Sequence, residues 1–351
     1  MTAAKKKNSR RKQARFRSSR RKRIRNTVLL LFLLVVLGGT GIGAIYVLRN
    51  GTVFDKLEDA YVASREFSGG ITDLDSLRAD GFAKNLCVVV SDVPMDGVSL
   101  GENQKGLLLD LDDRKVLYSK QALQKVYPAS ITKIMTAMLA LKYGNMDDVV
   151  TITQENLNLE EGSQVCGFWA GDQVTMDQLL HCLLVYSGND AAAAIAEHVG
   201  GSTDGFVEMM NSYARELGCT GTHFTNPHGL QDENHYTTPY DIYLMLKEAL
   251  NYPEFTQITQ SGSYTVEYTH ADGSSASTTL LATDHYLTGE ATPPKNVTIL
   301  GGKTGTTDNA GNCLALLSQN AYGKPYISIV MGASTKDELY EQMSSLLQSI
   351  N

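Results

Sequence analysis

The sequence predicts an α+β domain whose sheet is assembled from segments that lie far apart in the chain. Apolar, strand-like runs occur at residues 106–118, and the next group of several such runs lies at residues 297–331. Patterns with the 3.6-residue repeat of amphipathic helices occupy much of the interval between them. Strands at both ends with helices between them imply an α+β domain.

The first predicted elements are a hairpin and a helix. The runs 106–111 and 115–118 are separated by Asp112-Asp113-Arg114, which is typical of a hairpin turn. Pro128 then precedes apolar residues at helical spacing, and Gly144 is the expected stop of this helix. Further helices are predicted at residues 176–185, 190–198, 203–217 and 239–250.

The remaining strands lie in the C-terminal third of the chain. Residues 264–268 alternate as a strand does, and Asp272-Gly273 marks a turn after them. Three more strands are predicted at residues 297–300, 313–317 and 326–331. Residues 336–350 have the pattern of an amphipathic helix that closes the chain.

Charge divides the chain into two unequal parts. Residues 1–26 hold 13 of the 31 Lys and Arg residues and no acidic residue. The remainder therefore carries a net charge of −20, although the whole chain carries −7. Such an asymmetry indicates that the two parts meet different surroundings.

An apolar run separates these two parts. Residues 28–48 contain no charged side chain, and as a helix they span about 30 Å, the thickness of the hydrocarbon core of a bilayer. We therefore expect a single transmembrane anchor at residues 27–48, held in membrane lipid. The basic tail 1–26 is expected in the cytoplasm, because positive flanks resist translocation, and the rest of the chain is expected outside.

Two other interpretations of this region are weaker. A cleaved signal peptide has a shorter apolar core, and no cleavage site is obvious after Leu48. Basic tails also bind nucleic acid, but beside a spanning helix a role in orientation and in binding anionic lipid is simpler. We therefore expect no nucleic-acid partner.

Residues 49–100 form a juxtamembrane region of mixed character, and the folded domain is expected at 101–351. A short helix is predicted at 53–66 and a strand-like run at Cys87–Ser91. The five cysteines show no C-x-x-C spacing, and their odd number leaves at least one unpaired. We interpret them as small buried apolar residues, while one disulfide stays open. They are Cys87, Cys166, Cys182, Cys219 and Cys313.

The first candidate catalytic pair is Ser130 and Lys133. Pro128 places Ser130 in the first turn of a helix, and residues three apart share one helical face, so Lys133 projects beside the Ser130 hydroxyl. A serine becomes a nucleophile when a base takes its proton, and a lysine is such a base when its amine is neutral. Burial and a nearby cation both lower the pKa of a lysine.

Ser187-Gly188-Asn189 lies in a break between two predicted helices. A loop at this place can point two short polar side chains into a cleft. We expect Ser187 to relay a proton to a leaving group and Asn189 to hold a substrate amide. The alternative is that both residues only cap the helix that starts at Asp190.

The third motif is Lys303-Thr304-Gly305-Thr306, which follows the strand predicted at 297–300. A cationic strand facing the nucleophile binds a carboxylate, and the preceding Gly301 and Gly302 let a substrate backbone approach the strand edge. The alternative is an ordinary turn with a solvated lysine.

In this order the three motifs resemble those of the penicillin-recognising serine enzymes, and within them the low-molecular-mass D-alanyl-D-alanine carboxypeptidases. The resemblance extends from Gly106 to the C-terminal helix. It implies a β-lactamase/transpeptidase-like fold, in which an antiparallel sheet is flanked by helices and accompanied by an all-helical subdomain. Five further segments are similar to the family, namely Tyr127–Thr136, Glu161–Ser163, Leu183–Ala192, Asn226–Leu230 and His235–Thr238.

The resemblance also implies the chemistry. Ser130 would attack the carbonyl between two D-alanines of a peptidoglycan stem peptide and form an acyl-enzyme, with Lys133 as the base and Ser187 as proton carrier. Asn189 would position the peptide. The backbone N–H groups of Ser130 and Thr306 would form the oxyanion hole, and β-lactams would acylate Ser130. The residues that would bind the substrate and its terminal carboxylate are Lys303, Thr304, Gly305 and Thr306.

Other functions of the same motifs stay open. A class A β-lactamase shares the fold but needs a glutamate between the second and third motifs. Glu155 precedes Ser187 and Glu233 lacks the flanking pattern, so we expect slow release of β-lactams. A non-enzymatic β-lactam sensor or wall-binding module is an alternative of another class. Carboxypeptidase, endopeptidase and transpeptidase activities share one acyl-enzyme, and the motifs do not distinguish them.

A Ser-His-Asp hydrolase is disfavoured because no G-x-S-x-G sequence surrounds Ser130. We expect His223 and His228 to make structural hydrogen bonds instead. The chain has no H-E-x-x-H sequence and no Cys/His pairing typical of a metal site, so we expect neither a metal nor a cofactor.

Overall fold

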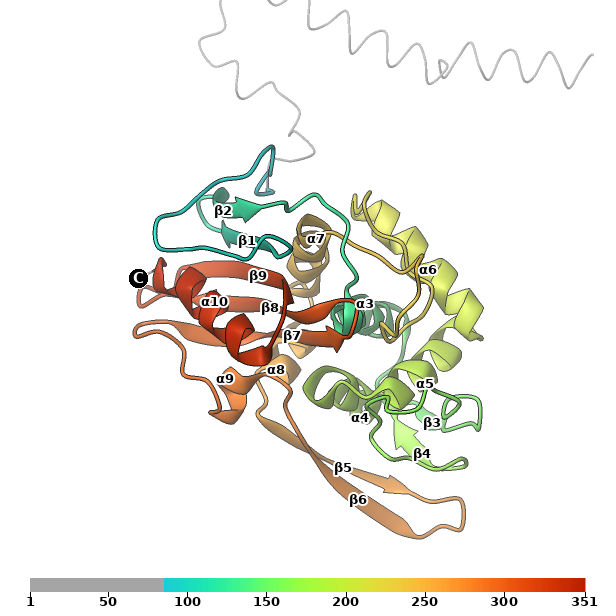
Figure 1. Cartoon of the computed structure of the whole chain (residues 1–351). Coiled ribbons are helices and arrows are strands. Elements are labelled where there is room, and N and C mark those ends of the chain that lie inside the picture. The colour runs from blue at the N-terminus through green and yellow to red at the C-terminus, as the bar shows by residue number, and fades with distance from the viewer. Residues whose placement is uncertain (1–84, 351) are drawn as a thin grey trace, which may run out of the picture. The chain divides into compact units, whose positions relative to one another are not determined.

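Two antiparallel sheets and the helices between them make up residues 85–350, the part of the chain that the computed structural model describes (Figure 1). The larger sheet has the strand order β2-β1-β9-β8-β7. Its members come from both ends of the domain, as the sequence predicts for an α+β fold. They are β1 (Lys105–Asp110), β2 (Lys115–Lys120), β7 (Thr298–Thr307), β8 (Gly311–Gln319) and β9 (Pro325–Ala333).

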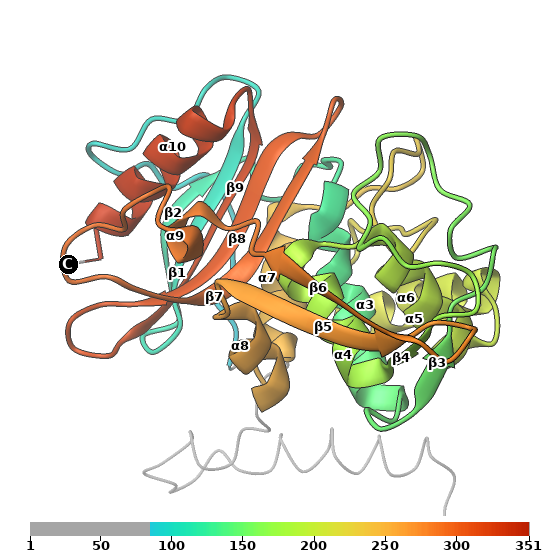
Figure 2. The same ribbon diagram turned by 90° about the horizontal axis from the view of Figure 1, so that it is seen from below.

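Both faces of this sheet are buried, because successive side chains of a strand point to opposite faces. Leu107 and Leu109 belong to the hydrophobic cluster on the side of the central helices. Leu108 lies in a second cluster, which contains the apolar side chains of α10 (Lys336–Gln348). Figure 2 shows α10 on one side of the sheet and the larger group of helices on the other.

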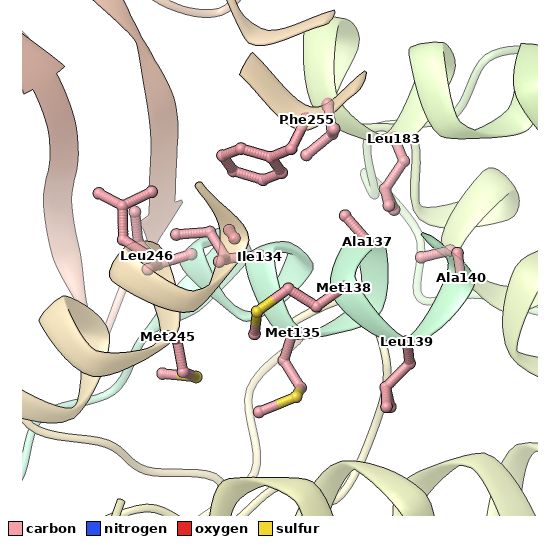
Figure 3. Packing of buried hydrophobic residues seen from close by; sticks show 14 of the residues in the cluster. Ile134, Met135, Ala137, Met138, Leu139, Ala140, Leu183, Met245, Leu246 and Phe255 are labelled. Atoms are coloured by element: carbon pink, nitrogen blue, oxygen red, sulfur yellow. The ribbon is translucent and has the colours of Figure 1, made fainter. Parts of the chain in front are cut away.

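Helix α3 (Lys133–Tyr143) lies at the centre of the helical part. The spacing of its apolar residues predicts one buried face, but all of residues 133–140 are buried. Figure 3 shows the reason, since Leu183, Leu246 and Phe255 from other helices surround its side chains. A helix that is buried all round holds its first residue, Lys133, away from water.

The other predicted helices are present, with two differences at their ends. A four-residue 3₁₀ turn, η2 (Ala129–Thr132), precedes α3, and the helix predicted at 176–185 changes into one π-helical turn, η3 (Cys182–Tyr186). Two short helices, α8 (Pro253–Thr259) and α9 (His285–Thr288), are not predicted. The remaining helices are α4 (Met176–His181), α5 (Asn189–Gly200), α6 (Thr203–Glu216) and α7 (Pro239–Ala249).

The subdomain between the outer strands is not purely helical, which corrects the expectation. It contains a second sheet with the order β3-β4-β5-β6. The strand predicted at 264–268 and the turn at Asp272-Gly273 are confirmed, and a strand that was not predicted completes a hairpin of β5 (Ser263–Thr269) and β6 (Ser275–Leu281). The hairpin extends from beneath the larger sheet toward β4 (Figures 1 and 2). The strands β3 (Val149–Thr151) and β4 (Gln173–Thr175) have three residues each, too few to give a periodic signal.

The N-terminal end of the described chain packs on the domain. The Cys87 N–H donates a hydrogen bond of 2.9 Å to the Tyr243 hydroxyl, and Leu100 belongs to the cluster around α10. The strand predicted at Cys87–Ser91 is wrong, since pairing begins only with an isolated bridge between Val93 and Ser119. All five cysteines are buried and unpaired, so the disulfide left open by the sequence does not form.

Several predictions concern residues outside the described range. They are the basic tail 1–26, the anchor 27–48 and the helix 53–66. Between residues 85 and 350, no helix combines the length and apolarity needed to cross a membrane.

Candidate active site

Ser130 lies in the 3₁₀ turn η2, directly before α3, as predicted from Pro128. The turn is held in a strained form, since Ala129 has a φ of 47° in the left-handed region. Thr132 fixes it, because its hydroxyl donates to the Ala129 carbonyl at 2.8 Å and lies 2.8 Å from Nε2 of the buried His235. Burial lowers the pKa of His235 to about 4, so this imidazole is neutral at neutral pH.

Lys133 reaches back over the same turn to Ser130. Its Nζ lies 2.8 Å from the Ser130 hydroxyl, 2.6 Å from Asn189 Oδ1 and 2.8 Å from the His228 carbonyl oxygen. The side chain is fully buried. The pKa of Lys133 lies well below its usual range, chiefly because the amine is buried and secondly because Lys303 is positively charged. The geometry predicted for a serine and its amine base is therefore present.

The turn η3 presents Ser187 to the same place. A π-helical turn widens the helix by one residue, and η3 ends at Ser187, which has a φ of 72°. The Ser187 side chain is buried, yet its Oγ has no hydrogen-bond partner among residues 85–350. A strained residue with an unpaired buried hydroxyl is typical of a functional position rather than of a helix cap.

Asn189 is the first residue of α5, but it does not cap that helix. The N-cap is Gly188, which makes no side-chain hydrogen bond. The Asn189 amide instead turns inward to Lys133. The capping alternative left open by the sequence is therefore wrong for Asn189, because its side-chain oxygen serves the lysine.

Asp190 ties the loop of the predicted Glu161–Ser163 segment to α5. Its buried carboxylate accepts from the backbone N–H of Cys166 at 2.8 Å and of Gly167 at 3.2 Å. The Asn189 N–H also donates to the Gln164 carbonyl at 2.8 Å. This loop therefore forms a fixed wall beside Ser187 and Asn189.

The third motif lies within a strand rather than after one. The strand predicted at 297–300 continues through the motif to Thr307, with a bulge between Ile299 and Gly301. Lys303 is buried, and its Nζ donates to the Thr304 carbonyl at 3.1 Å, so the alternative of a solvated lysine is wrong. Burial lowers the pKa of Lys303 to about 7, against the opposing influence of Asp284.

Strand β7 runs directly past the nucleophile turn at Gly305. A Cβ at this position would stand 3.0 Å from the Ser130 nitrogen and 2.9 Å from the Pro128 carbonyl oxygen. Glycine is thus required for the close approach of β7 to η2. The hydroxyls of Thr304 and Thr306 have partners on other elements, at 2.5 Å to Thr283 and 3.1 Å to Asn312.

These elements enclose a cavity of about 330 Å³. Lys133 and Lys303 lie behind its wall, where they are shielded from water. None of the lining residues is an Asp or a Glu, and Glu233 lines a different hollow, of about 700 Å³. Six predicted site residues line the cavity, namely Ser130, Ser187, Asn189, Thr304, Gly305 and Thr306.

The sequence did not reveal how the segment Asn226–Leu230 completes the site. The His228 carbonyl accepts from Lys133, while its imidazole has a pKa lowered to about 3, chiefly by burial. Gly229 has a φ of 89° and lies so close to η2 that a Cβ would stand 1.8 Å from the Ala129 carbonyl oxygen. His223 Nδ1 lies 2.7 Å from the Asn234 carbonyl, the structural contact expected of it.

The described residues contain no cluster of three or more His, Cys, Asp or Glu side chains suited to a metal ion. The chemistry available at the cavity is therefore that of a serine activated by a buried amine, next to a buried cation. On this fold, such a site defines the class of the penicillin-recognising serine enzymes.

Comparison with known proteins identifies the family within this class. The family model described as D-alanyl-D-alanine carboxypeptidase, peptidase S11, matches residues 101–335. The chain belongs to this family.

Among curated relatives, D-alanyl-D-alanine carboxypeptidase DacF of Bacillus subtilis is 36% identical over 70% of this chain and 61% of its own length. DacC of Escherichia coli is 33% identical over 69% of this chain and 59% of its own. The chain thus spans about three fifths of the length of these relatives.

Solved structures agree with the fold. The Streptomyces K15 DD-transpeptidase aligns with a TM-score of 0.64 at 27% identity, over 73% of this chain and 97% of its own. A D-alanyl-D-alanine carboxypeptidase of Mycobacterium tuberculosis aligns with a TM-score of 0.63 at 28% identity, over 73% and 92%.

Proposed function

We propose that this protein is a serine D-Ala-D-Ala carboxypeptidase that trims the terminal D-alanine from peptidoglycan stem peptides. The observation that carries the proposal is the 2.8 Å contact between the fully buried amine of Lys133 and the Ser130 hydroxyl. Family membership and the carboxypeptidase names of the relatives support the same activity.

In the acylation step, neutral Lys133 takes the proton of Ser130, and Ser130 Oγ bonds to the carbonyl carbon between the two D-alanines. The backbone N–H groups of Ser130 and Thr306 stabilise the oxyanion. The C–N bond then breaks, and the leaving D-alanine takes a proton through Ser187, a cavity residue whose Oγ has no hydrogen-bond partner among residues 85–350.

Substrate binding uses the opposite wall of the cavity. Strand β7 provides the buried positive charge of Lys303 and the hydroxyls of Thr304 and Thr306. The terminal carboxylate of the substrate therefore binds at this strand. Gly305 allows the strand to approach the nucleophile turn closely, and Asn189 positions the peptide. Water then attacks the acyl-enzyme and releases Ser130 and the shortened peptide.

β-Lactams are proposed to acylate Ser130 by the same route and to leave slowly. A class A β-lactamase needs a glutamate beside the ester, and no carboxylate lines this cavity within the described part of the chain. The serine–amine contact equips the site for acylation, which favours an enzyme over a module that only binds.

We further propose that residues 27–48 anchor the protein in the membrane lipid. The tail 1–26 would remain in the cytoplasm and the catalytic domain would face the cell wall. The uncharged apolar run and the 13 basic residues before it support this topology.

The deciding assay measures D-alanine released from a short peptide ending in D-Ala-D-Ala. We expect release by the wild-type chain and none by Ser130→Ala, with products identified by mass. Cleavage of a cross-linked peptide dimer without release of D-alanine from the short peptide would reassign the reaction to an endopeptidase. Transfer to an added amino acceptor in place of hydrolysis would reassign it to a transpeptidase. Wild-type and Ser130→Ala chains that behave alike would refute the nucleophile.

A further inference from the structure

Trp169 is the only tryptophan in the chain, and it is 67% exposed. It lies in the loop between β3 and β4, outside the proposed catalytic machinery. A large aromatic side chain normally gains stability by burial, so an indole that is exposed and also held in place offers an ordered apolar face to a ligand.

The indole is ordered by stacking on a histidine, and one carboxylate holds both that histidine and the backbone of Trp169. The ring of Trp169 stacks on His270, with centroids 4.8 Å apart and planes inclined by 20°. The buried Asp172 joins the two residues, because its Oδ1 lies 2.7 Å from His270 Nδ1 and its Oδ2 accepts from the backbone N–H of Trp169 at 2.8 Å. The indole face turned away from His270 is therefore presented in a fixed orientation, which reduces the entropy lost on binding.

The surrounding loop is seated on the hairpin β5–β6, the element that extends toward β4 in Figure 2. Phe168 is buried and meets the Tyr268 ring edge-on at 5.2 Å. Gly171 adopts a φ of 93°, and a Cβ there would stand 2.7 Å from the Ala271 side chain. The exposed residues next to His270, at 271–275, are mainly polar and include Asp272, Ser274 and Ser275.

The same loop forms a wall of the catalytic cavity. Gly162, Ser163 and Gln164 line the cavity, and Trp169 is five positions after Gln164, a separation that spans at most about 18 Å. An extended stem peptide of about five residues has a similar reach. A stem peptide bound at Ser130 is therefore long enough to bring its sugar to Trp169 if it runs along this loop.

We propose that Trp169 is a platform for an N-acetylated sugar ring of the glycan strand. The apolar face of a pyranose ring packs on the open indole face, and the polar side chains at the hairpin tip surround it. A protein partner or a membrane surface would use a contiguous apolar patch of several hundred Å², whereas this site offers one ring among polar neighbours. The proposal rests on the proposed function, since the glycan is the polymer to which the peptide substrate is attached.

The single tryptophan makes binding directly measurable. The full-length chain is titrated with chitotetraose, a β-1,4-linked tetramer of N-acetylglucosamine, while tryptophan emission is recorded. We expect a saturable change in emission, and none with maltotetraose. An unchanged emission with chitotetraose overturns the platform, and an equal response to maltotetraose overturns its assignment to N-acetylated sugars. A response to anionic lipid vesicles alone assigns the residue to a membrane surface instead.

Kinetics supply an independent test with Trp169→Ala. The value of kcat/KM for D-alanine release is expected to fall about 3- to 10-fold on polymeric peptidoglycan and to stay unchanged on a short peptide ending in D-Ala-D-Ala. Trp169→Phe should retain most of the wild-type kcat/KM on the polymer. Tyr322→Ala is the matched control, because Tyr322 is an exposed aromatic residue in the turn between β8 and β9.

Equal activity of Trp169→Ala and wild type on the polymer would overturn the inference. A loss of the same size on both substrates would overturn it too, because the residue would then only position the cavity wall. If the wild type releases D-alanine from neither substrate, the proposed function fails, while the chitotetraose titration still decides the platform.

Discussion

Asn189 Oδ1 accepts a hydrogen bond of 2.6 Å from Lys133 Nζ, and both side chains are buried. The acceptor is a neutral amide, so it orients the amine without adding a negative charge that would hold its proton. Burial and Lys303 can then keep the pKa of Lys133 low. Whether residue 189 is an asparagine or an aspartate therefore determines whether Lys133 is neutral and can act as the base.

Asn189→Asp tests this relationship. A carboxylate 2.6 Å from the amine favours the protonated form, so the pKa of Lys133 should rise and the base should be lost at neutral pH. We expect acylation of Ser130 by penicillin at pH 7 to slow about 100-fold or more. The acidic limb of the pH–rate profile of acylation should lie at higher pH in Asn189→Asp than in the wild type. In Asn189→Ala this limb should stay at the wild-type pH. An unshifted limb in Asn189→Asp would contradict the assignment of Lys133 as base.

The fall of kcat/KM on the alkaline side of its pH profile should reflect the deprotonation of Lys303. Its pKa is lowered to about 7, so the cation is present below that pH and is lost as pH rises through it. The value of kcat/KM should therefore fall above about pH 7, because it reports the free enzyme. The kcat profile should fall at a higher pH, since a bound carboxylate favours the protonated lysine.

Lys303→Met provides the control for that profile. This variant should be slow at every pH and should lack the alkaline limb. Its acidic limb should move upward, because removal of a neighbouring positive charge raises the pKa of Lys133. An alkaline limb at the same pH in Lys303→Met would assign the titration to another group.

Gly229→Ala should damage both stability and activity. A Cβ would stand 1.8 Å from the Ala129 carbonyl oxygen, so the segment must move away from the nucleophile turn. We expect a loss of about 2–4 kcal/mol in the free energy of unfolding, measured by urea denaturation, and a large fall in kcat. Gly289→Ala has a similar φ of 82° with nothing within 4 Å of the added Cβ, so it should cost only about 1–2 kcal/mol and leave kcat unchanged.

Penicillin should form a lasting adduct on Ser130. Mass spectrometry of the intact chain should show one added penicilloyl group that persists for many catalytic half-lives of the peptide reaction, and Ser130→Ala should show none. The physical reason is the absence of a carboxylate from the cavity lining of the described chain. Rapid turnover of penicillin without an adduct would favour the β-lactamase alternative.

Sequence periodicity predicted the long elements because their patterns are local. The strands of the larger sheet and the helices α5, α6, α7 and α10 each carry enough residues to reveal their period. Periodicity did not predict β3 and β4, which are too short to show a period, and it placed the end of β7 too early in the sequence. Gly301 and Gly302 read as a break, whereas they continue the strand through a bulge that brings it against Thr259 and onward to Lys303.

The candidate site was predictable where one short segment carries its own chemistry. The spacing of Ser130 and Lys133 predicted their contact, since one helical turn joins them. The contribution of His228 was not predictable, because it acts through a backbone carbonyl that any residue provides. The unpaired hydroxyl of Ser187 depends on the π-helical turn before it, for which no sequence rule exists here.

The order of strands in the larger sheet sets a condition on how this protein is made. Lys105 of β1 pairs with Met331 of β9, so β1 has no partner on one side until the more than 200 residues that separate the two strands have emerged from the ribosome. Strand β7, which runs past Ser130, joins the sheet only through β8. Nascent chains should therefore remain inert toward β-lactams until β9 has been synthesised.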